Sequence, residues 1–140
     1  MNDIPGVTEL RLVVTAPDYP EALTFYRDVL GLPELAAYAS PGGRVAMLAA
    51  GRATLELADP AHAAYVDTVE VGRRVAGHVR VAFEVGETAG ATARLAAAGA
   101  AIIAEPVATP WRSLNSRLTA PAGLQLTLFS ALNPAPRPSP

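Results

Sequence analysis

The most constraining feature of this 140-residue sequence is an internal repeat of one supersecondary unit. A short strand pattern at residues 10–14 is followed by a helix pattern and three further strand patterns, and the same order returns after Gly77. The offset between the two first strands, from Arg11 to His78, is 67 residues. Because neither half has enough elements to close a core alone, the repeat predicts that both halves pack together around a pseudo-two-fold axis.

The helix of the first half has clear start and stop signals. Asp18 can accept a hydrogen bond from the first turn, and Pro20 is tolerated there because first-turn N–H groups have no intrahelical partner. Apolar residues then recur with the period of a helix until Gly31, which supplies a C-terminal stop. Three strands are predicted after it, at residues 34–39, 44–50 and 53–58.

The second half repeats this pattern. The strictly alternating run 78–85 predicts a strand, and the helix over about 87–98 ends at Gly99. Residues 59–76, which connect the halves, are interpreted as an ordered loop rather than a flexible linker. Three strands are predicted at the end of the chain, at residues 101–106, 115–119 and 124–130.

Taken together, these elements predict an α+β fold. Two tandem βαβββ modules, at about 7–58 and 78–130, are expected to form curved mixed sheets around a central pocket. Both modules belong to a single domain over residues 1–132 in this interpretation. The proline-rich tail 133–140 is expected to be disordered because it has nothing to bury.

Alternation along the strands separates an apolar set of side chains from a more polar set. We expect the apolar set to pack beneath the helices and the polar set to line the concave face of the sheets. A polar face that is merely solvated is the alternative, because open antiparallel sheets often have one. The polar set consists of Arg11, Glu56, His78, Arg80, Gln125 and Thr127.

The composition excludes several classes of protein. Without cysteine, the chain has no disulfide, no thiolate nucleophile and no thiolate zinc site. A formal net charge of −2 provides no basic surface for nucleic acid or for an anionic membrane. No run approaches the roughly 18 apolar residues of a membrane span, and the N-terminus lacks the features of a signal peptide. We therefore expect a cytoplasmic protein whose partners include neither nucleic acid nor a membrane.

Four segments carry a resemblance to a known family. The run 25–32, preceded by Asp18, resembles the first helix of the vicinal oxygen chelate superfamily, also called the glyoxalase/bleomycin-resistance/extradiol-dioxygenase family. Residues 55–57, 77–79 and 120–126 resemble its later landmarks. The resemblance extends over roughly residues 7–130 and implies the glyoxalase/bleomycin-resistance fold.

The resemblance also implies where a metal site would lie. Metalloenzymes of the family place His and Glu ligands on the first and last strands of each unit, and the corresponding residues here are Arg11, Glu56, His78 and Thr127. A guanidinium stays protonated and has no lone pair to donate, and a threonine hydroxyl is a poor substitute for a carboxylate. Only Glu56 and His78 are ordinary ligands, which is fewer than a catalytic site requires. We expect no tightly held metal and no cofactor.

A small-molecule ligand would instead meet these side chains directly. Arg11 offers a rigid fork of donors for a carboxylate, phenolate or carbonyl oxygen, and it is expected to pair with Glu56 across the pocket. Trp111 is expected to stack on a planar ligand, although packing in the core or in a dimer is its alternative. The alternative for Glu56 is a structural ion pair, and the alternative for His78 is a hydrogen-bonded histidine in a strand. The remaining predicted contacts are Arg80, Thr127, Met47 and Phe129.

Three functions are compatible with this pattern. The first is a metal-independent protein that binds or sequesters an aromatic or amphipathic natural product, as in antibiotic resistance. The second is a lyase, isomerase, cyclase or dioxygenase that uses Glu56 and His78 for acid–base chemistry or for metal binding. The third is a dimerisation module with a vestigial pocket. The resemblance implies a homodimer in each case, and the ligand stays unnamed because this fold hosts many chemistries.

Overall fold

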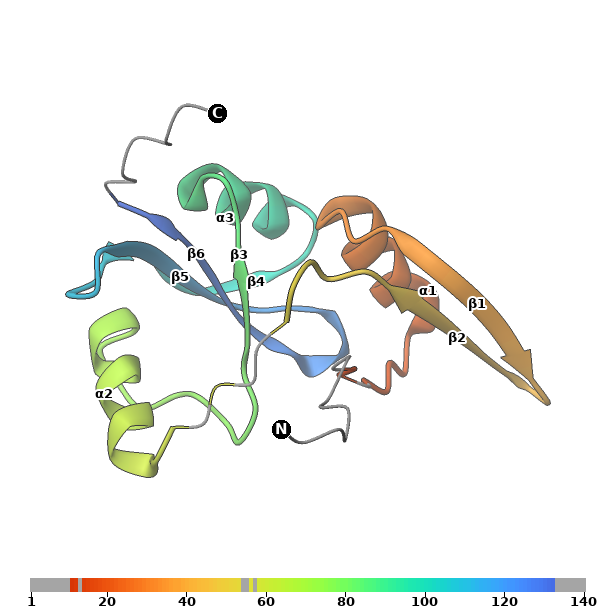
Figure 1. The fold of residues 1–140 in the computed structure, drawn as a ribbon, viewed down its shortest axis with the longest axis horizontal. Coiled ribbons are helices and arrows are strands. Elements are labelled where there is room, and N and C mark those ends of the chain that lie inside the picture. Colours follow the sequence, from red (N-terminus) through yellow and green to blue (C-terminus); the bar gives the residue numbers. More distant parts are fainter. Residues whose placement is uncertain (1–10, 13, 54–55, 57, 133–140) are drawn as a thin grey trace, which may run out of the picture. The chain divides into compact units, whose positions relative to one another are not determined.

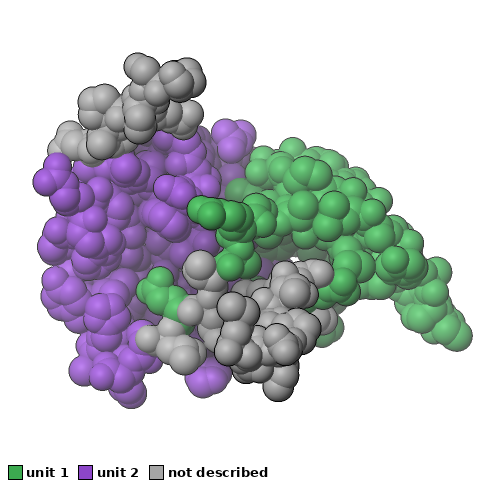
Figure 2. Space-filling view, in the orientation of Figure 1, with its two compact units in different colours: residues 1–57 green, residues 58–140 purple. Residues whose placement is uncertain are grey.

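The computed structural model describes residues 11–12, 14–53, 56 and 58–132 (Figure 1). The chain divides into two compact units, residues 1–57 and residues 58–140 (Figure 2). Unit 1 contains a helix and a two-stranded sheet, and unit 2 contains a four-stranded sheet with helices. The predicted α+β class is therefore confirmed. None of the helices in the described part of the chain is long and apolar enough to cross a membrane.

The helix of unit 1 begins as predicted. Helix α1 (Tyr19–Leu23) runs directly into a π-helical segment, η1 (Thr24–Val29). An oxygen of Asp18 accepts a hydrogen bond from the backbone N–H of Glu21 at 3.1 Å, which satisfies one of the free donors of the first turn. Gly31, with a φ of +90°, follows the end of this helix and adopts a conformation that other residues rarely reach.

Two antiparallel strands complete the described part of unit 1. Strand β1 (Glu34–Ser40) pairs with β2 (Gly43–Leu48), and Tyr38 lies opposite Val45. Both strands were predicted. The predicted strands at 10–14 and 53–58 lie partly outside the described residues, and the described residues of these two segments do not belong to a strand.

Unit 2 contains a mixed sheet in the order β3-β6-β5-β4. Strand β3 runs parallel to β6, while β4 and β6 both run antiparallel to β5. The predicted strand 78–85 is shorter than expected and does not include His78. The strands are β3 (Val81–Glu84), β4 (Ala101–Ala108), β5 (Ser113–Thr119) and β6 (Gln125–Ala131), with a 3-10 turn, η2 (Pro121–Gly123), between the last two.

Helix α3 (Thr88–Ala97) covers one face of this sheet and closes an apolar core. Leu95 of the helix and Leu118, Leu126 and Leu128 of the strands are fully buried. Since alternate residues of a strand share a face, the prediction that the apolar set of the last strand packs under a helix is confirmed. Small hydroxyls link the layers as well, because the side-chain oxygen of Thr92 lies 2.7 Å from that of Ser116.

The interpretation of residues 59–76 as a loop is wrong for most of the segment. Residues 60–70 form helix α2 (Pro60–Glu70), and Asp59 caps it by accepting a hydrogen bond from the N–H of His62 at 2.8 Å. Two of the three buried residues of this helix are the carboxylates Asp67 and Glu70, and only Val66 is apolar. A helix that buries carboxylates lacks the apolar period by which helices are recognised in a sequence, and this explains the error.

Helices α2 and α3 cover opposite faces of the unit 2 sheet (Figure 1). Ser116 contacts α3, whereas its neighbour Arg117 contacts α2, and adjacent residues of a strand point to opposite faces. We call the α2 side the polar face. It bears Asn115, Arg117, Gln125 and Thr127.

Candidate functional site

The predicted site residues belong to both units. Arg11, Met47 and Glu56 are in unit 1. The others, His78, Arg80, Trp111, Thr127 and Phe129, are in unit 2. The structure describes the surroundings of these residues within each unit, and the predicted pairing of Arg11 with Glu56 stays a prediction.

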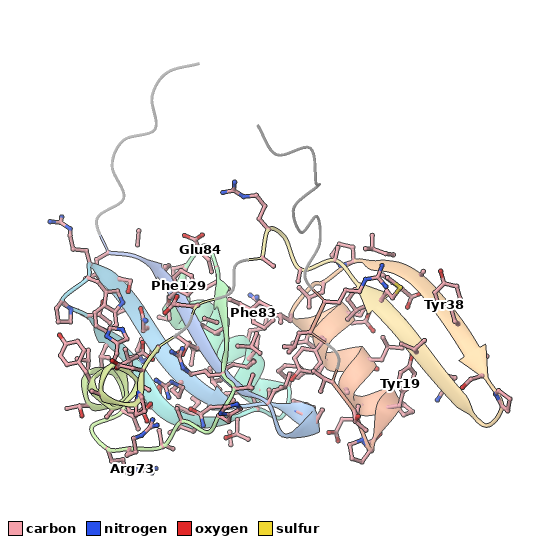
Figure 3. All side chains as sticks on the ribbon, turned by 60° about the horizontal axis from the view of Figure 1, so that its bottom comes forward. Tyr19, Tyr38, Arg73, Phe83, Glu84 and Phe129 are labelled. Carbon is pink, nitrogen blue, oxygen red and sulfur yellow. The ribbon has the colours of Figure 1, made fainter. Side chains whose placement is uncertain are left out.

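In unit 1, the hairpin brings Arg11 and Met47 together. A guanidinium nitrogen of Arg11 donates to the sulfur of Met47 at 3.8 Å. The register pairs Ala36 with Met47 and Tyr38 with Val45, so these four side chains share one face, which we call the Met47 face. Figure 3 shows Tyr38 on this side of the hairpin and Tyr19, from α1, on the other.

Tyr38 is the aromatic residue of the Met47 face, and it was not among the predicted site residues. Its side chain is 61% exposed, and Val45 beside it is also exposed. A cation, a thioether and an aromatic ring on one accessible face form a surface suited to a flat organic molecule. The strand register of the predicted hairpin would have revealed Tyr38, because it places Tyr38 two residue pairs along from Met47 and therefore on the same face.

In unit 2, Arg80 and Thr127 are brought together on the polar face. The guanidinium of Arg80 donates to the hydroxyl of Thr127 at 2.6 Å, and that hydroxyl donates to Glu70 at 3.3 Å. Thr127 is only 1% exposed. Phe129 is half-buried and lies opposite Glu84 in the sheet register (Figure 3). His78 is exposed.

Trp111 lies at the surface with other aromatic side chains. Its ring centroid is 6.2 Å from that of Tyr65 on α2, and the ring of Tyr65 is 6.2 Å from that of His62. The loop that carries Trp111 is held by the side-chain oxygens of Thr109 and Ser113, which lie 2.9 Å apart. Trp111 is therefore an exposed ring on an ordered loop, and Tyr65 is a neighbour that the sequence did not suggest.

Two of the residues at the expected metal-ligand positions, Thr127 and Arg11, do not suit a dication. Thr127 already accepts a hydrogen bond from the guanidinium of Arg80, so a fixed positive charge lies next to the oxygen that would have to coordinate. Arg11, at another of these positions, carries a second fixed positive charge. Within the described residues, no three His, Asp or Glu side chains gather into a metal-binding group.

The most strongly organised part of the polar face is a buried ion cluster. Arg117 of β5 is fully buried, and Asp67 and Glu70 of α2 are 1% and 3% exposed. The two terminal nitrogens of Arg117 lie 2.8 Å from an oxygen of Asp67 and 2.8 Å from an oxygen of Glu70. The first of these nitrogens also donates to Gln125 at 2.7 Å. We call Asp67, Glu70 and Arg117 the buried triad.

Further hydrogen bonds complete the triad. The second oxygen of Asp67 accepts from Arg74 at 2.7 Å and from the backbone N–H groups of Val75 and Ala76, each at 2.8 Å. The second oxygen of Glu70 accepts from the amide of Asn115 at 2.8 Å. Two guanidinium groups thus balance two carboxylates. No buried side-chain nitrogen or oxygen among the described residues lacks a hydrogen-bond partner.

This environment shifts the ionisation of Asp67. Burial alone would raise the pKa of its carboxyl, because the interior disfavours the charged form. The N–H groups of Ala76 and Val75 and the guanidinium groups of Arg117 and Arg74 favour the charged form, and together they hold the pKa of Asp67 well below its ordinary value. Asp67 is therefore a permanent anion under physiological conditions.

The triad fixes α2 to β5, and the helix also contacts β4. On β3, Ala82 and Glu84 remain exposed. The polar face is consequently divided into a part closed by charge pairing and a part near β3, where Arg80 is half-buried. Among the described residues of the polar face, the part near β3 is the more exposed of the two.

Comparison with known proteins identifies the family of this chain. A family model described as "Glyoxalase/Bleomycin resistance protein/Dioxygenase superfamily" matches residues 10–128. A search of curated proteins finds no match for the chain.

Several solved structures share the fold. TnmS3, an antibiotic binding protein from Streptomyces sp. CB03234, is 21% identical with a TM-score of 0.60, over 91% of this chain and 99% of its own. A superfamily member from Sphaerobacter thermophilus DSM 20745 is 21% identical with a TM-score of 0.56, over 84% and 91%. A glyoxalase-related enzyme from Fulvimarina pelagi is 18% identical with a TM-score of 0.54, over 89% and 88%. At these identities the likeness establishes the fold alone.

Replacing the cation of the triad should strongly destabilise the protein. Arg117→Met leaves two carboxylates buried without their main partner, and we expect the free energy of unfolding to fall by about 3–5 kcal/mol. Arg117→Lys keeps the charge but loses the fork, so its loss should be smaller. Urea unfolding measures both. Arg94→Met, at an exposed position of α3, is the control and should stay within about 0.5 kcal/mol. A loss below about 1 kcal/mol for Arg117→Met would contradict this account of the triad.

The lowered pKa of Asp67 also predicts an acid-sensitive stability. The folded pKa lies below the unfolded value of about 3.9, so the stabilisation is complete above that pH and is lost as the pH falls further. Wild-type stability should therefore decrease more steeply below about pH 4 than that of Asp67→Asn, which cannot titrate there. Unfolding curves across this range measure the slopes. Asp59→Asn, which keeps a good helix cap, is the control and should show the same dependence of stability on pH as the wild type. Equal slopes for wild type and Asp67→Asn would refute the assignment.

Proposed function

This chain belongs to the glyoxalase/bleomycin resistance protein/dioxygenase superfamily, and we propose that it binds a small organic molecule directly, without a metal ion. The ligand class is a planar aromatic or amphipathic natural product, and the biological role is sequestration. The observation that supports the proposal is the hydrogen bond of 2.6 Å between Arg80 and Thr127, because it puts a fixed positive charge next to a hydroxyl at an expected metal-ligand position.

Guanidinium groups suit this role for a simple electrostatic reason. A metal ion attracts the oxygens of a ligand through positive charge, and an arginine offers positive charge together with directed N–H donors. Arg11 in unit 1 and Arg80 in unit 2 are the two arginines that we propose as ligand contacts. Each is expected to meet a carboxylate, phenolate or carbonyl oxygen of the ligand.

The apolar part of the proposed ligand has its own support. The Met47 face combines the exposed ring of Tyr38 with Val45 and the adaptable thioether of Met47. Trp111, Phe129 and His78 are the proposed contacts in unit 2. Flat rings stack well on such side chains, whereas a small polar metabolite would leave them exposed to water.

The relatives are compatible with this proposal. TnmS3 is described as an antibiotic binding protein, and it shares the fold over nearly the whole of both chains. Sequestration needs no catalytic group, which agrees with the loss of two of the four metal-ligand residues. A cytoplasmic homodimer completes the proposal, as the sequence and the family resemblance lead us to expect.

Fluorescence titration tests the proposal directly. Trp111 is the one tryptophan of the sequence, so its emission reports on the neighbourhood of the site. We expect saturable quenching by at least one planar aromatic antibiotic in a broad panel, and no change in affinity after chelation with EDTA. Arg11→Gln and Arg80→Gln should each weaken binding by roughly tenfold, as expected for the loss of a charge-assisted hydrogen bond.

Matched controls separate this role from the alternatives. Arg94→Gln removes an exposed charge from α3 and should leave affinity unchanged. Calorimetry on the same panel detects ligands that bind without changing the emission of Trp111. Absence of binding across the panel, or loss of binding with EDTA, would refute the proposal. Turnover of a ligand that disappears in Glu56→Gln or His78→Asn would favour the acid–base enzyme instead.

A further inference from the structure

Unit 1 contains a groove whose charged residue, Arg44, none of the functional assignments above uses. It lies between α1 and the β1–β2 hairpin and has a volume of about 340 Å³, within the range of roughly 300–1,000 Å³ of small-molecule sites. Tyr19 and Leu23 of α1 line one side, and Ala37, Ala39 and Arg44 line the hairpin side. Tyr38, Val45 and Glu34 complete the border.

The groove is distinct from the Met47 face. Ala39 pairs with Arg44, one residue pair along the hairpin from Tyr38 and Val45. Because adjacent residues of a strand point to opposite faces, Arg44 and Ala39 project away from the Met47 face. In Figure 3, Tyr19 accordingly lies on the other side of the hairpin from Tyr38. A ligand held by Arg44 would therefore lie on the other side of the hairpin from Met47, although Tyr38 and Val45 border both surfaces.

Arg44 gives the groove its charge. Its guanidinium carbon lies 4.7 Å from the centroid of the Tyr19 ring, a cation–π contact that orients the side chain. Among the residues that the structure describes, no Asp or Glu forms an ion pair with Arg44. The guanidinium is thus held in place by a neutral ring, which leaves its N–H donors available to an anion.

The single carboxylate of the groove does not cancel this charge. Glu34 pairs with Arg27 at 3.2 Å. It lies five residues along β1 from Ala39, the partner of Arg44, a distance of about 17 Å in an extended strand. The groove consequently has a cation at one end and, at the other, an acid that shares Arg27 with Asp28.

The walls between these ends are small and apolar. Ala37 and Ala39 leave space over the strand, and Leu23 and the Tyr19 ring face that space from the helix. One or two fused aromatic rings suit such a volume, and a carboxylate at the edge of the ring plane suits the arginine fork. We propose that this groove binds a small planar aromatic carboxylate, at a second site separate from the one in the proposed function.

The test uses 2-naphthoate as the probe and the full-length, isotope-labelled protein. Amide chemical shifts should change saturably in α1, β1 and β2, and 2-naphthamide, which lacks the charge, should bind more weakly. Arg44→Gln should weaken binding of 2-naphthoate by about tenfold or more, because it removes the charge-assisted hydrogen bonds. Arg44→Lys should lose part of the affinity, since it keeps the charge without the fork.

Control variants make the result specific. Arg52→Gln removes another exposed arginine of unit 1 and should bind like wild type. Arg80→Gln should also bind like wild type, although it impairs the proposed site in unit 2. The proposal is overturned by an absence of saturable shifts at millimolar probe, by shifts confined to unit 2, or by equal affinity of Arg44→Gln and wild type. Dimerisation that depends on Arg44, seen by light scattering, would assign the groove to a contact between copies and would overturn it as well.

Discussion

Arg117 imposes the central constraint on unit 2, because it places a permanent cation in the middle of a strand that is covered on both faces. Removing such an ion from water costs several kcal/mol unless opposite charges and hydrogen bonds replace the lost hydration. Asp67 and Glu70 provide those charges at 2.8 Å, and both come from α2. The helix is therefore required by the strand. An isolated helix of 11 residues is marginal in water, so the strand in turn stabilises the helix.

The same charges shape the chemistry of the polar face. Glu70 accepts hydrogen bonds from Arg117, Asn115 and Thr127, and Thr127 in turn accepts from Arg80. The position that would have to coordinate a metal is thus built into a network of arginine and carboxylate groups. A network of this kind favours recognition of ligand oxygens by N–H donors over coordination to a dication. This is the physical link between the buried triad and the proposed direct binding of a small molecule.

Helix caps and strand alternation were sufficient to predict the elements that depend on neighbouring residues alone. Asp18 and Gly31 delimit the first helix, and alternation in the last strand predicted that Leu126 and Leu128 face a helix. Alternation also put Arg80 and Thr127 on one face, but it cannot reveal which partners a polar side chain finds. Helix α2 was missed because its buried side is charged. The partnership of Arg117 with Asp67, 50 residues earlier in the sequence, depends on tertiary structure that no local pattern encodes.

Hydrogen exchange of the backbone amides of α2 tests the mutual dependence of helix and triad most directly. If opening the helix leaves Arg117 buried without its carboxylates, α2 can open only when the sheet unfolds as well. The amides of α2 should then exchange with the same free energy as those of β5 and β6. Exchange of α2 at the rate of an isolated peptide, while β5 and β6 stay protected, would contradict this account.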